Sequence, residues 1–143
     1  MTAAEFVARA VADGDFTVLA EAIPYMRTLG IAVRPVGSGI VVILDAAERH
    51  VGNPWAQTLH GGVIGGLLET AAIVQLAFDQ RSNALPKPIN VTVDYLRSGR
   101  LAETHAQATV TRLGKRVANV RATCWQSDSS EPIAALSGHF LVG

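Results

Sequence analysis

A histidine, two pairs of glycines and one carboxylate occur within eleven residues, LHGGVIGGLLE, from Leu59 to Glu69. The glycines would let a ligand approach bare backbone amides at a helix N-terminus, where unpaired N–H groups and the helix dipole favour negative charge. A carboxylate in an apolar run beside them has the character of a general base or a nucleophile. His60, Gly61, Gly62 and Glu69 are therefore the primary candidates for chemistry.

Glu69 interrupts an otherwise apolar sequence, with VIGGLL before it and TAAIVQLAF after it. This pattern predicts a buried helix over about residues 62–80. None of the neighbours of Glu69 at helical spacing offers a cation or a donor side chain. A buried, unpaired carboxylate is costly unless its pKa rises or it is hydrogen-bonded. The alternatives are a structural glutamate paired with an arginine from another strand, or one facing water at the helix edge.

The spacing between the glycines and the carboxylate predicts an oligomer. Along a helix that starts just after His60, Glu69 lies roughly 12 to 14 Å from the amides of Gly61 and Gly62. One acyl carbon cannot touch both groups of one chain. If both act on one substrate, two antiparallel copies of the helix must lie side by side, which predicts an obligate homodimer with two equivalent sites.

Composition indicates a globular protein: 143 residues, 49% hydrophobic and 17% charged. We expect one domain over residues 1–143, with residues 1–29 as a helical N-terminal extension. No apolar stretch reaches membrane-spanning length without a charge, and the N-terminus lacks the pattern of a signal peptide. A cytoplasmic protein that acts without a membrane is therefore expected.

Cysteine, histidine and charge usage narrow the chemistry further. Cys124 is the only cysteine, so an intrachain disulfide is excluded, and it is interpreted as a core residue. The four histidines have no metal-ligand spacing, so we expect no metal and no other cofactor. Residues 81–143 carry eight basic and four acidic side chains, which favours an anionic ligand there. The even overall charge and few aromatic residues argue against nucleic acid.

Hydrophobic periodicity predicts the elements around this segment. Helices are expected at about 3–12 and 17–26, the second broken by Pro24, followed by a hairpin of strands over 31–37 and 39–46. A loop over 50–58 leads into the long helix. Strands are then expected over 89–96, 101–113, 117–126 and 133–142. Short connections imply antiparallel neighbours, so the prediction is an α+β fold with a curved antiparallel sheet wrapped around the central helix.

In this order, five sequence features resemble those of one family: Asn53-Pro54, LHGG at 59–62, Glu69 nine residues after the histidine, VDYLR at 93–97 and RLGKR at 112–116. The chain resembles the hotdog-fold acyl-CoA thioesterases of the PaaI-like (phenylacetic acid degradation) group over about residues 30–142. The resemblance implies hydrolysis of a thioester bound between two subunits. By position, Gly61 looks like the oxyanion donor, His60 helps to shape that pocket, and Glu69 of the facing subunit looks like the nucleophile or the base.

The resemblance also implies a coenzyme A moiety with phosphates, and a homodimer that can associate further as a dimer of dimers. Arginine and lysine side chains suit phosphates. The candidates for substrate binding are Asn53, Gly62, Arg97, Arg100, Arg112, Lys115 and Arg116. Two prolines depart from the family pattern: Pro54 stands where many relatives carry an amide, and Pro88 where relatives with an aspartate catalyst often carry a hydroxyl.

Two other functions remain open from the sequence. The same dimer could bind acyl-CoA without turning it over, as a sensor or carrier, although a pure binding site gains nothing from an acid in an apolar tunnel. The third candidate function is that of a hotdog enoyl-CoA hydratase or dehydratase. It ranks below the other two because the histidine and the acid of those enzymes lie farther apart in sequence than His60 and Glu69.

Overall fold

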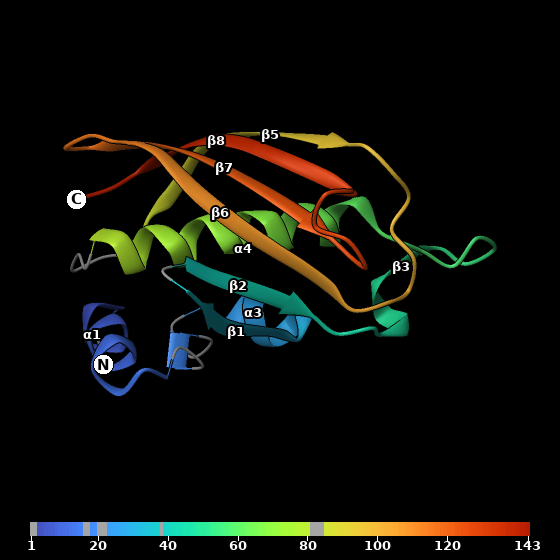
Figure 1. The fold of residues 1–143 in the computed structure, drawn as a ribbon, viewed down its shortest axis with the longest axis horizontal. Coiled ribbons are helices and arrows are strands. Elements are labelled where there is room, and N and C mark those ends of the chain that lie inside the picture. Colours follow the sequence, from blue (N-terminus) through green and yellow to red (C-terminus); the bar gives the residue numbers. More distant parts are fainter. Residues whose placement is uncertain (1–2, 16–17, 20–22, 38, 81–84) are drawn as a thin grey trace.

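A six-stranded antiparallel sheet bends around one long helix, α4 (Gly61–Gln80), in the computed structural model of the chain (Figure 1). The structure describes residues 3–15, 18–19, 23–37, 39–80 and 85–143. The strands lie in the order β1-β2-β6-β7-β8-β5, and every neighbouring pair is antiparallel. They are β1 (Ile31–Val36), β2 (Gly39–Leu44), β5 (Lys87–Tyr95), β6 (Thr104–Leu113), β7 (Val117–Trp125) and β8 (Ala134–Leu141). The predicted α+β architecture is confirmed.

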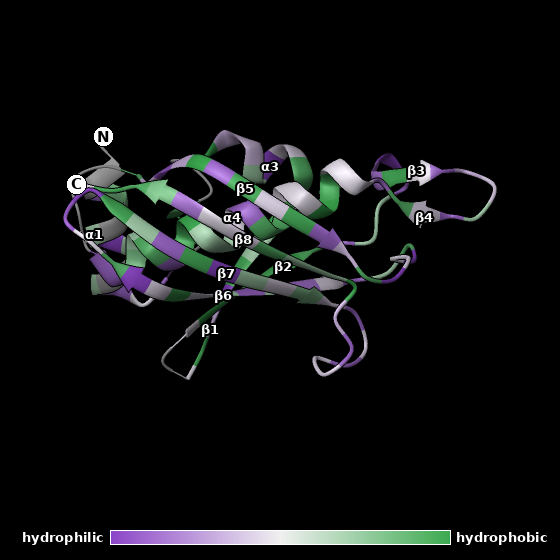
Figure 2. Cartoon of the chain, turned by 90° about the horizontal axis from the view of Figure 1, so that it is seen from above, coloured by the Kyte–Doolittle hydropathy of each residue, from purple (hydrophilic) through white to green (hydrophobic). Residues whose placement is uncertain are grey.

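Small side chains line the sheet where it faces α4. Buried and exposed residues alternate along β7 and β8, and the same alternation appears as hydrophobic and hydrophilic bands in Figure 2. The buried alanines of this inner face are Ala106, Ala108, Ala118, Ala122 and Ala134. Because alanine is short, the helix can lie close to the sheet, and larger side chains such as Leu67, Leu68 and Phe140 fill the remaining space.

Helix α4 is the buried core helix that the sequence predicts, and it begins one residue earlier, at Gly61. By length and composition alone it could cross a membrane, but more than half of its most apolar window is buried inside the protein. Its packing against β2, β6 and β7 accounts for that apolar character.

The two outer strands of the sheet each contain a proline. Pro35 lies in β1 and Pro88 in β5, where the sequence predicted a strand only from Ile89. Proline cannot donate a ladder hydrogen bond, so it is tolerated on edge strands. A register irregularity between Pro88 and Asn90 accommodates it. Strand β5 therefore has one neighbour, β8, and one open edge.

The N-terminal helices differ in part from the prediction. Helix α1 (Ala3–Asp13) agrees with the expected helix at 3–12. The second helix, expected over 17–26 and broken by Pro24, agrees at residues 18–19, which are helical, but not at its end, because α3 (Pro24–Leu29) begins at that proline and continues past residue 26. Proline lacks an N–H that the first turn would leave unpaired, so it suits a helix start. Residues 16–17 and 20–22 of the expected helix lie outside the described residues.

The segment before α4 contains more structure than the predicted loop. A 3-10 turn, η2 (Glu48–His50), leads into a two-stranded hairpin of β3 (Val51–Asn53) and β4 (Thr58–Leu59). The strand predicted from Leu101 begins at Thr104 instead, because the chain bends before it and the Thr104 hydroxyl donates to the carbonyl of Ala102.

Candidate active site

His60 caps the start of α4 with both its backbone and its ring. Its carbonyl oxygen accepts the N–H of Val63 (3.0 Å) and of Ile64 (3.2 Å), and its ring Nδ1 accepts the N–H of Gly62 (2.9 Å). A backbone amide can only donate, so Nδ1 carries no proton, and the neutral ring holds its proton on Nε2. The ring therefore binds one of the amides that a helix start leaves unpaired.

The Gly61 N–H is the first amide of α4, and it has no acceptor among the described residues. The next amide, that of Gly62, is taken by the His60 ring. Unpaired N–H groups and the helix dipole give this end of the helix partial positive charge. Of the two candidate amides, those of Gly61 and Gly62, the Gly61 N–H is thus the one that can donate to an oxygen of a ligand.

Two segments, residues 50–52 and Gly99, hold His60 and the residue before it in place. Its N–H donates to the carbonyl of His50 (2.8 Å), and the N–H of Leu59 donates to the carbonyl of Gly99 (2.9 Å). Gly52 passes so close that a Cβ there would lie 2.7 Å from the Cα of His60. Only a glycine fits at this crossing, and the backbone before α4 is consequently fixed on both sides.

Tyr95, the last residue of β5, reaches across to the same helix turn. Its hydroxyl donates to the carbonyl oxygen of Gly61 (2.8 Å). Its ring lies over the first turns of α4, since a Cβ on Gly61 or Gly65 would lie 3.4 or 3.7 Å from its nearest atoms. The contact between Tyr95 and Gly61 could not be predicted from the sequence, because no local spacing links the end of β5 to the start of α4.

An open pocket of about 430 Å³ lies directly beside the Gly61 amide. It is lined by residues from the end of β4, the start of α4 and the chain after β5, including Leu59, Gly61, Ile64, Tyr95, Leu96 and Arg97. The pocket lining mixes apolar side chains with the polar helix tip, and more of its exposed surface is polar than apolar.

Glu69 lies on the uncovered side of α4. Each residue advances about 100° around the helix, so Glu69 lies about 80° around the axis from Gly61. On the same scale Gly65, which Tyr95 covers, lies at about 40°, and Gly66 lies at about 140°. Tyr25 and Leu29 of α3 cover Gly66. Glu69 is half-buried, and among the described residues it has no hydrogen bond or ion pair. No arginine of the described chain pairs with it, and a single chain leaves it partly open instead of enclosed.

Asn53 shapes the hairpin between β3 and β4. Its Oδ1 accepts the N–H groups of Trp55 (3.0 Å) and Ala56 (3.2 Å), and the Gln57 side chain donates to the carbonyl of Pro54 (2.7 Å). Trp55 stands 91% exposed at the tip of this turn. The oxygen of the Asn53 amide is therefore engaged locally, whereas its nitrogen is left for other partners.

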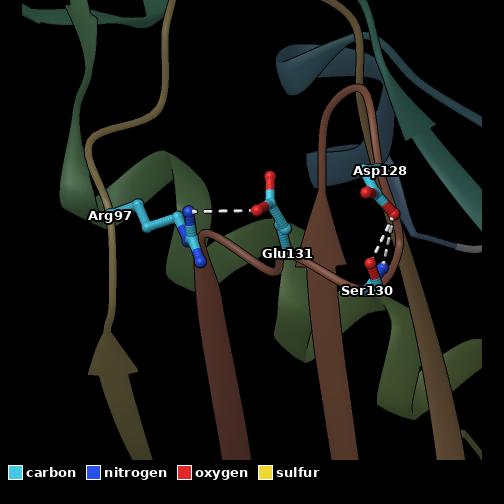
Figure 3. Close-up of polar contacts among 4 residues, drawn as sticks. All are labelled: Arg97, Asp128, Ser130 and Glu131. Atoms are coloured by element: carbon cyan, nitrogen blue, oxygen red, sulfur yellow. Dashed lines mark hydrogen bonds and ion pairs between the residues drawn. The ribbon is translucent and has the colours of Figure 1, made fainter.

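Arg97 is the predicted cation nearest to Gly61, since both line the same pocket. Its Nη1 lies 3.8 Å from Glu131 Oε1, and both side chains are more than half exposed (Figure 3). The neighbouring Asp128 accepts hydrogen bonds from the hydroxyl and the N–H of Ser130 in its own turn. These hydrogen bonds are the main reason why the pKa of Asp128 is lowered. In the described part of the chain, Arg97 thus has one loose, water-screened ion pair, with Glu131, and its charge also helps to lower the pKa of Asp128.

Arg100 lies near Arg97, whereas the other predicted cations lie at the far end of the sheet. Arg112, Lys115 and Arg116 surround the turn between β6 and β7, next to Lys87 and Leu141. Tyr95 pairs with Ala134 at the opposite end of the same strands, about 25 Å away at roughly 3.3 Å per residue. One chain does not bring these cations together with Gly61 and Arg97.

Two buried groups lie outside this site. Cys124 is fully buried, as predicted, and burial raises the pKa of its thiol to about 12. His50 is 1% exposed, and neither ring nitrogen has a hydrogen-bond partner in the described part of the chain. Within the same residues, no group of three histidine, cysteine, aspartate or glutamate side chains could hold a metal ion.

Comparison with known proteins identifies the family. The model of the acyl-CoA thioesterase N-terminal domain matches residues 51–141, which include the hairpin, α4 and strands β5 to β8. The chain belongs to this family of hotdog-fold thioesterases. It is accordingly a thioester hydrolase, and the predicted resemblance to hotdog-fold acyl-CoA thioesterases is confirmed.

Individual relatives agree with this assignment. The thioesterase chain is 30% identical over 135 residues to the medium/long-chain acyl-CoA thioesterase YigI of Salmonella typhimurium, covering 84% of this chain and 86% of that protein. A crystal structure of a protein from Chromobacterium violaceum is 33% identical, with a TM-score of 0.78 and 96% of each chain covered. The E. coli PaaI protein of the phenylacetic acid degradation operon is 22% identical and shares the fold, with a TM-score of 0.72 over 98% of each chain.

Proposed function

We propose that two copies of this thioesterase form a two-fold dimer that hydrolyses the thioester of an acyl-CoA. The Gly61 amide of one copy and the Glu69 carboxylate of the other act on one carbonyl group. The observation that carries the proposal is the unbonded Gly61 N–H at the start of a 20-residue helix, beside an open pocket. Each dimer contains two equivalent sites, one at each helix start.

The length of α4 argues for two chains at each site. Glu69 follows Gly61 by eight residues of unbroken helix, which is about 12 Å along the axis. A single carbonyl group cannot contact both positions in one chain. An antiparallel copy of α4 on the uncovered side would bring its own Glu69 level with Gly61.

Strand β5 offers the surface for that pairing. Its outer edge has no neighbour, and Val91 and Tyr95, which share a face with Gly138 and Ala134 of β8, remain 38% and 56% exposed. These core-facing side chains stay partly exposed in the part of one chain that the structure describes. An antiparallel β5 from a second copy would continue the sheet and place the second α4 beneath them.

The chemistry requires few groups. When a thioester is attacked, negative charge develops on its carbonyl oxygen, and one preorganised N–H donor stabilises that charge by about 2.7–4 kcal/mol. Glu69 either takes the proton of the attacking water or attacks directly, forming a mixed anhydride that water then hydrolyses. In both routes the C–S bond breaks and the thiolate of coenzyme A leaves, later taking a proton.

Neighbouring residues position the substrate. His60 shapes the pocket and keeps Gly62 in place, because its Nδ1 is committed to the Gly62 amide. Gly62 has no side chain and leaves the approach to Gly61 open. The free amide nitrogen of Asn53 serves as a further donor to the substrate.

The phosphates of coenzyme A would meet cations from both copies. Arg97 and Arg100 lie near the Gly61 end of their own chain. Antiparallel pairing of β5 turns the other end of the second sheet toward this site. Arg112, Lys115 and Arg116 of the partner subunit would then approach the mouth of the pocket.

The proposal extends to assembly, location and substrate range. We expect dimers that can pair into tetramers, a cytoplasmic enzyme, and no requirement for a metal or another cofactor. Because its relative YigI is named a medium/long-chain acyl-CoA thioesterase, medium and long acyl chains are the first substrates to test.

The direct test is release of free thiol from short, medium, long and aryl acyl-CoAs by the purified protein. We expect turnover on at least one of them, and a loss of at least about 100-fold in Glu69→Gln, the lower range for removal of a general acid or base. Asp79→Asn is the matched control, since Asp79 is an exposed carboxylate on the same helix. Binding of acyl-CoA without turnover, or addition of water to an enoyl-CoA, would contradict the proposal.

A further inference from the structure

We propose that Tyr95 is a positioning residue that holds the first turn of α4 in the geometry that points the Gly61 N–H at the substrate carbonyl. The inference rests on the proposed function and adds to it a residue that contacts the helix backbone and acts through it. Its basis is the 2.8 Å hydrogen bond from the Tyr95 hydroxyl to the Gly61 carbonyl oxygen.

The first turn of α4 needs such support. Gly61 and Gly62 lack side chains, so they have more backbone freedom than any other pair of residues, and helix ends fray. His60 restrains the turn from one side through the Gly62 N–H. Tyr95 restrains it from the other side, through the carbonyl group of Gly61. Both contacts hold the Gly61–Gly62 peptide. The preceding His60–Gly61 peptide, which carries the free Gly61 N–H, is joined to it at the Gly61 Cα and is held by the hydrogen bonds that the His60 carbonyl accepts from Val63 and Ile64.

Tyr95 is itself anchored to the sheet. It pairs with Ala134 at the end of β5, and the following residues, Leu96 and Arg97, both donate their N–H to the carbonyl of Ile133 (2.8 and 3.1 Å). Its ring lies against the helix at Gly61 and Gly65, where the absence of side chains lets it approach the helix backbone. The hydroxyl is thus held by the sheet at a fixed distance from the helix start.

The hydroxyl is not needed to satisfy a buried group. The Gly61 carbonyl stands in the first turn of a helix, where the N–H four residues later serves as its partner, and Tyr95 is 56% exposed. If the residue served only to pack, phenylalanine would serve equally well. The Tyr95 hydroxyl, as a second hydrogen-bond donor to the Gly61 carbonyl oxygen, therefore acts mainly on the orientation of the Gly61–Gly62 peptide.

The chain contains a matched control, since it has only two tyrosines. Tyr25 of α3 is 52% exposed and also packs on a glycine of α4, with its ring and hydroxyl 3.3 and 3.4 Å from a Cβ built on Gly66. Its hydroxyl makes no hydrogen bond among the described residues. Tyr25 therefore shares residue type, exposure and helix with Tyr95, but not the bond to the backbone.

The test compares Tyr95→Phe and Tyr25→Phe on an acyl-CoA that the wild-type enzyme turns over. We expect Tyr95→Phe to lower kcat about tenfold, the factor that corresponds to about 1.4 kcal/mol, with KM changed less than about threefold. Tyr25→Phe should leave both constants unchanged. The melting temperature of each variant should stay within about 4 °C of the wild type.

Hydrogen exchange of 15N-labelled glycine amides supplies a readout that does not depend on turnover. We expect the amide of Gly62, which is hydrogen-bonded to the His60 ring and shares its peptide with the Gly61 carbonyl, to exchange faster in Tyr95→Phe than in Tyr25→Phe or the wild type. A wild-type protein without thioesterase activity would end the proposed function, while this comparison would still decide the role of Tyr95. Unchanged kcat in Tyr95→Phe, a rise in KM alone, or unchanged exchange at Gly62 would overturn the inference.

Discussion

Proline at position 61 would remove one N–H from the site and little else. Gly61 is the first residue of α4, where proline is favoured because its missing N–H is not needed by the helix. If the Gly61 amide stabilises the oxyanion, Gly61→Pro should lower kcat by about 10²–10³-fold while the protein stays folded. Steady-state kinetics with circular dichroism would measure both effects.

Gly61→Ala is the control for this prediction. It adds the same Cβ, about 3.4 Å from the Tyr95 ring, which is an ordinary contact, but keeps the N–H. Alanine should therefore retain most of the activity that proline abolishes. If both variants lost activity equally, the added side chain at position 61, and not the loss of the N–H, would be the cause.

Cys124 should make stability depend on alkaline pH. Burial raises the pKa of its thiol to about 12, so the unfolded chain loses this proton at a lower pH than the folded protein does. The contribution is complete below about pH 9, and the free energy of unfolding should fall as the pH rises from there toward 12. Urea unfolding of the wild type and Cys124→Ala between pH 7 and 10.5 should show a steeper fall in the wild type.

The same thiol should be inert in the native protein at neutral pH. Because it is buried and protonated, a thiol reagent should label it only after unfolding. Rapid labelling of the folded protein, or equal pH slopes for the wild type and Cys124→Ala, would contradict this account.

At the scale of elements, β5 is the strand on which the proposed dimer depends. Its two faces differ: Val91 lies on the side of α4, opposite Gly138, whereas Thr92 lies on the outer face, opposite Ser137. We expect Val91→Lys to disrupt the pairing of two copies, since a buried lysine without a partner is costly. The variant should run as a monomer in size-exclusion chromatography with light scattering, and should lose turnover.

Thr92→Lys tests whether the position within the strand decides this result. The substitution adds the same charge one residue away on the exposed outer face, so dimer and activity should both persist. A Val91→Lys protein that remains dimeric and active would place the interface elsewhere on the molecule.

At the scale of the whole molecule, mixing two inactive variants tests whether each site combines two chains. Gly61→Pro keeps its Glu69, and Glu69→Gln keeps its Gly61 amide. After unfolding and refolding together at equal amounts, half of the dimers are mixed, and each mixed dimer has one intact site. Activity should therefore return to about a quarter of the wild-type value, as expected for a two-fold dimer with two equivalent sites.

Each variant refolded alone provides the baseline for the mixing experiment and should stay inactive. If Gly61 and Glu69 acted within one chain, every protomer in the mixture would carry one defect, and no activity would return. This outcome would remove the dimer-interface site while leaving the thioesterase family assignment intact.

The sequence alone was sufficient for the long helix, the strands after it and the separation of Gly61 from Glu69. These features depend on local periodicity: apolar residues run unbroken around the helix, and Val91 and Val93 alternate with polar residues along β5. The family motif added the expected chemistry. The sequence predicts a helix break at Pro24 and the end of a loop at Pro88, whereas Pro24 starts a helix and Pro88 lies in an edge strand. Which of these roles a proline takes depends on its neighbours in space.

Only the tertiary structure decided which groups at the helix start are occupied and which are free. The His60 ring could have faced several donors, and Tyr95 lies 34 residues from Gly61, yet one takes the Gly62 amide and the other the Gly61 carbonyl. It likewise decided that β5 has an open edge and that Arg97 lies apart from Lys115. Hydrogen-bond partners and strand order are set by packing between segments far apart in the chain, and local sequence patterns carry no record of them.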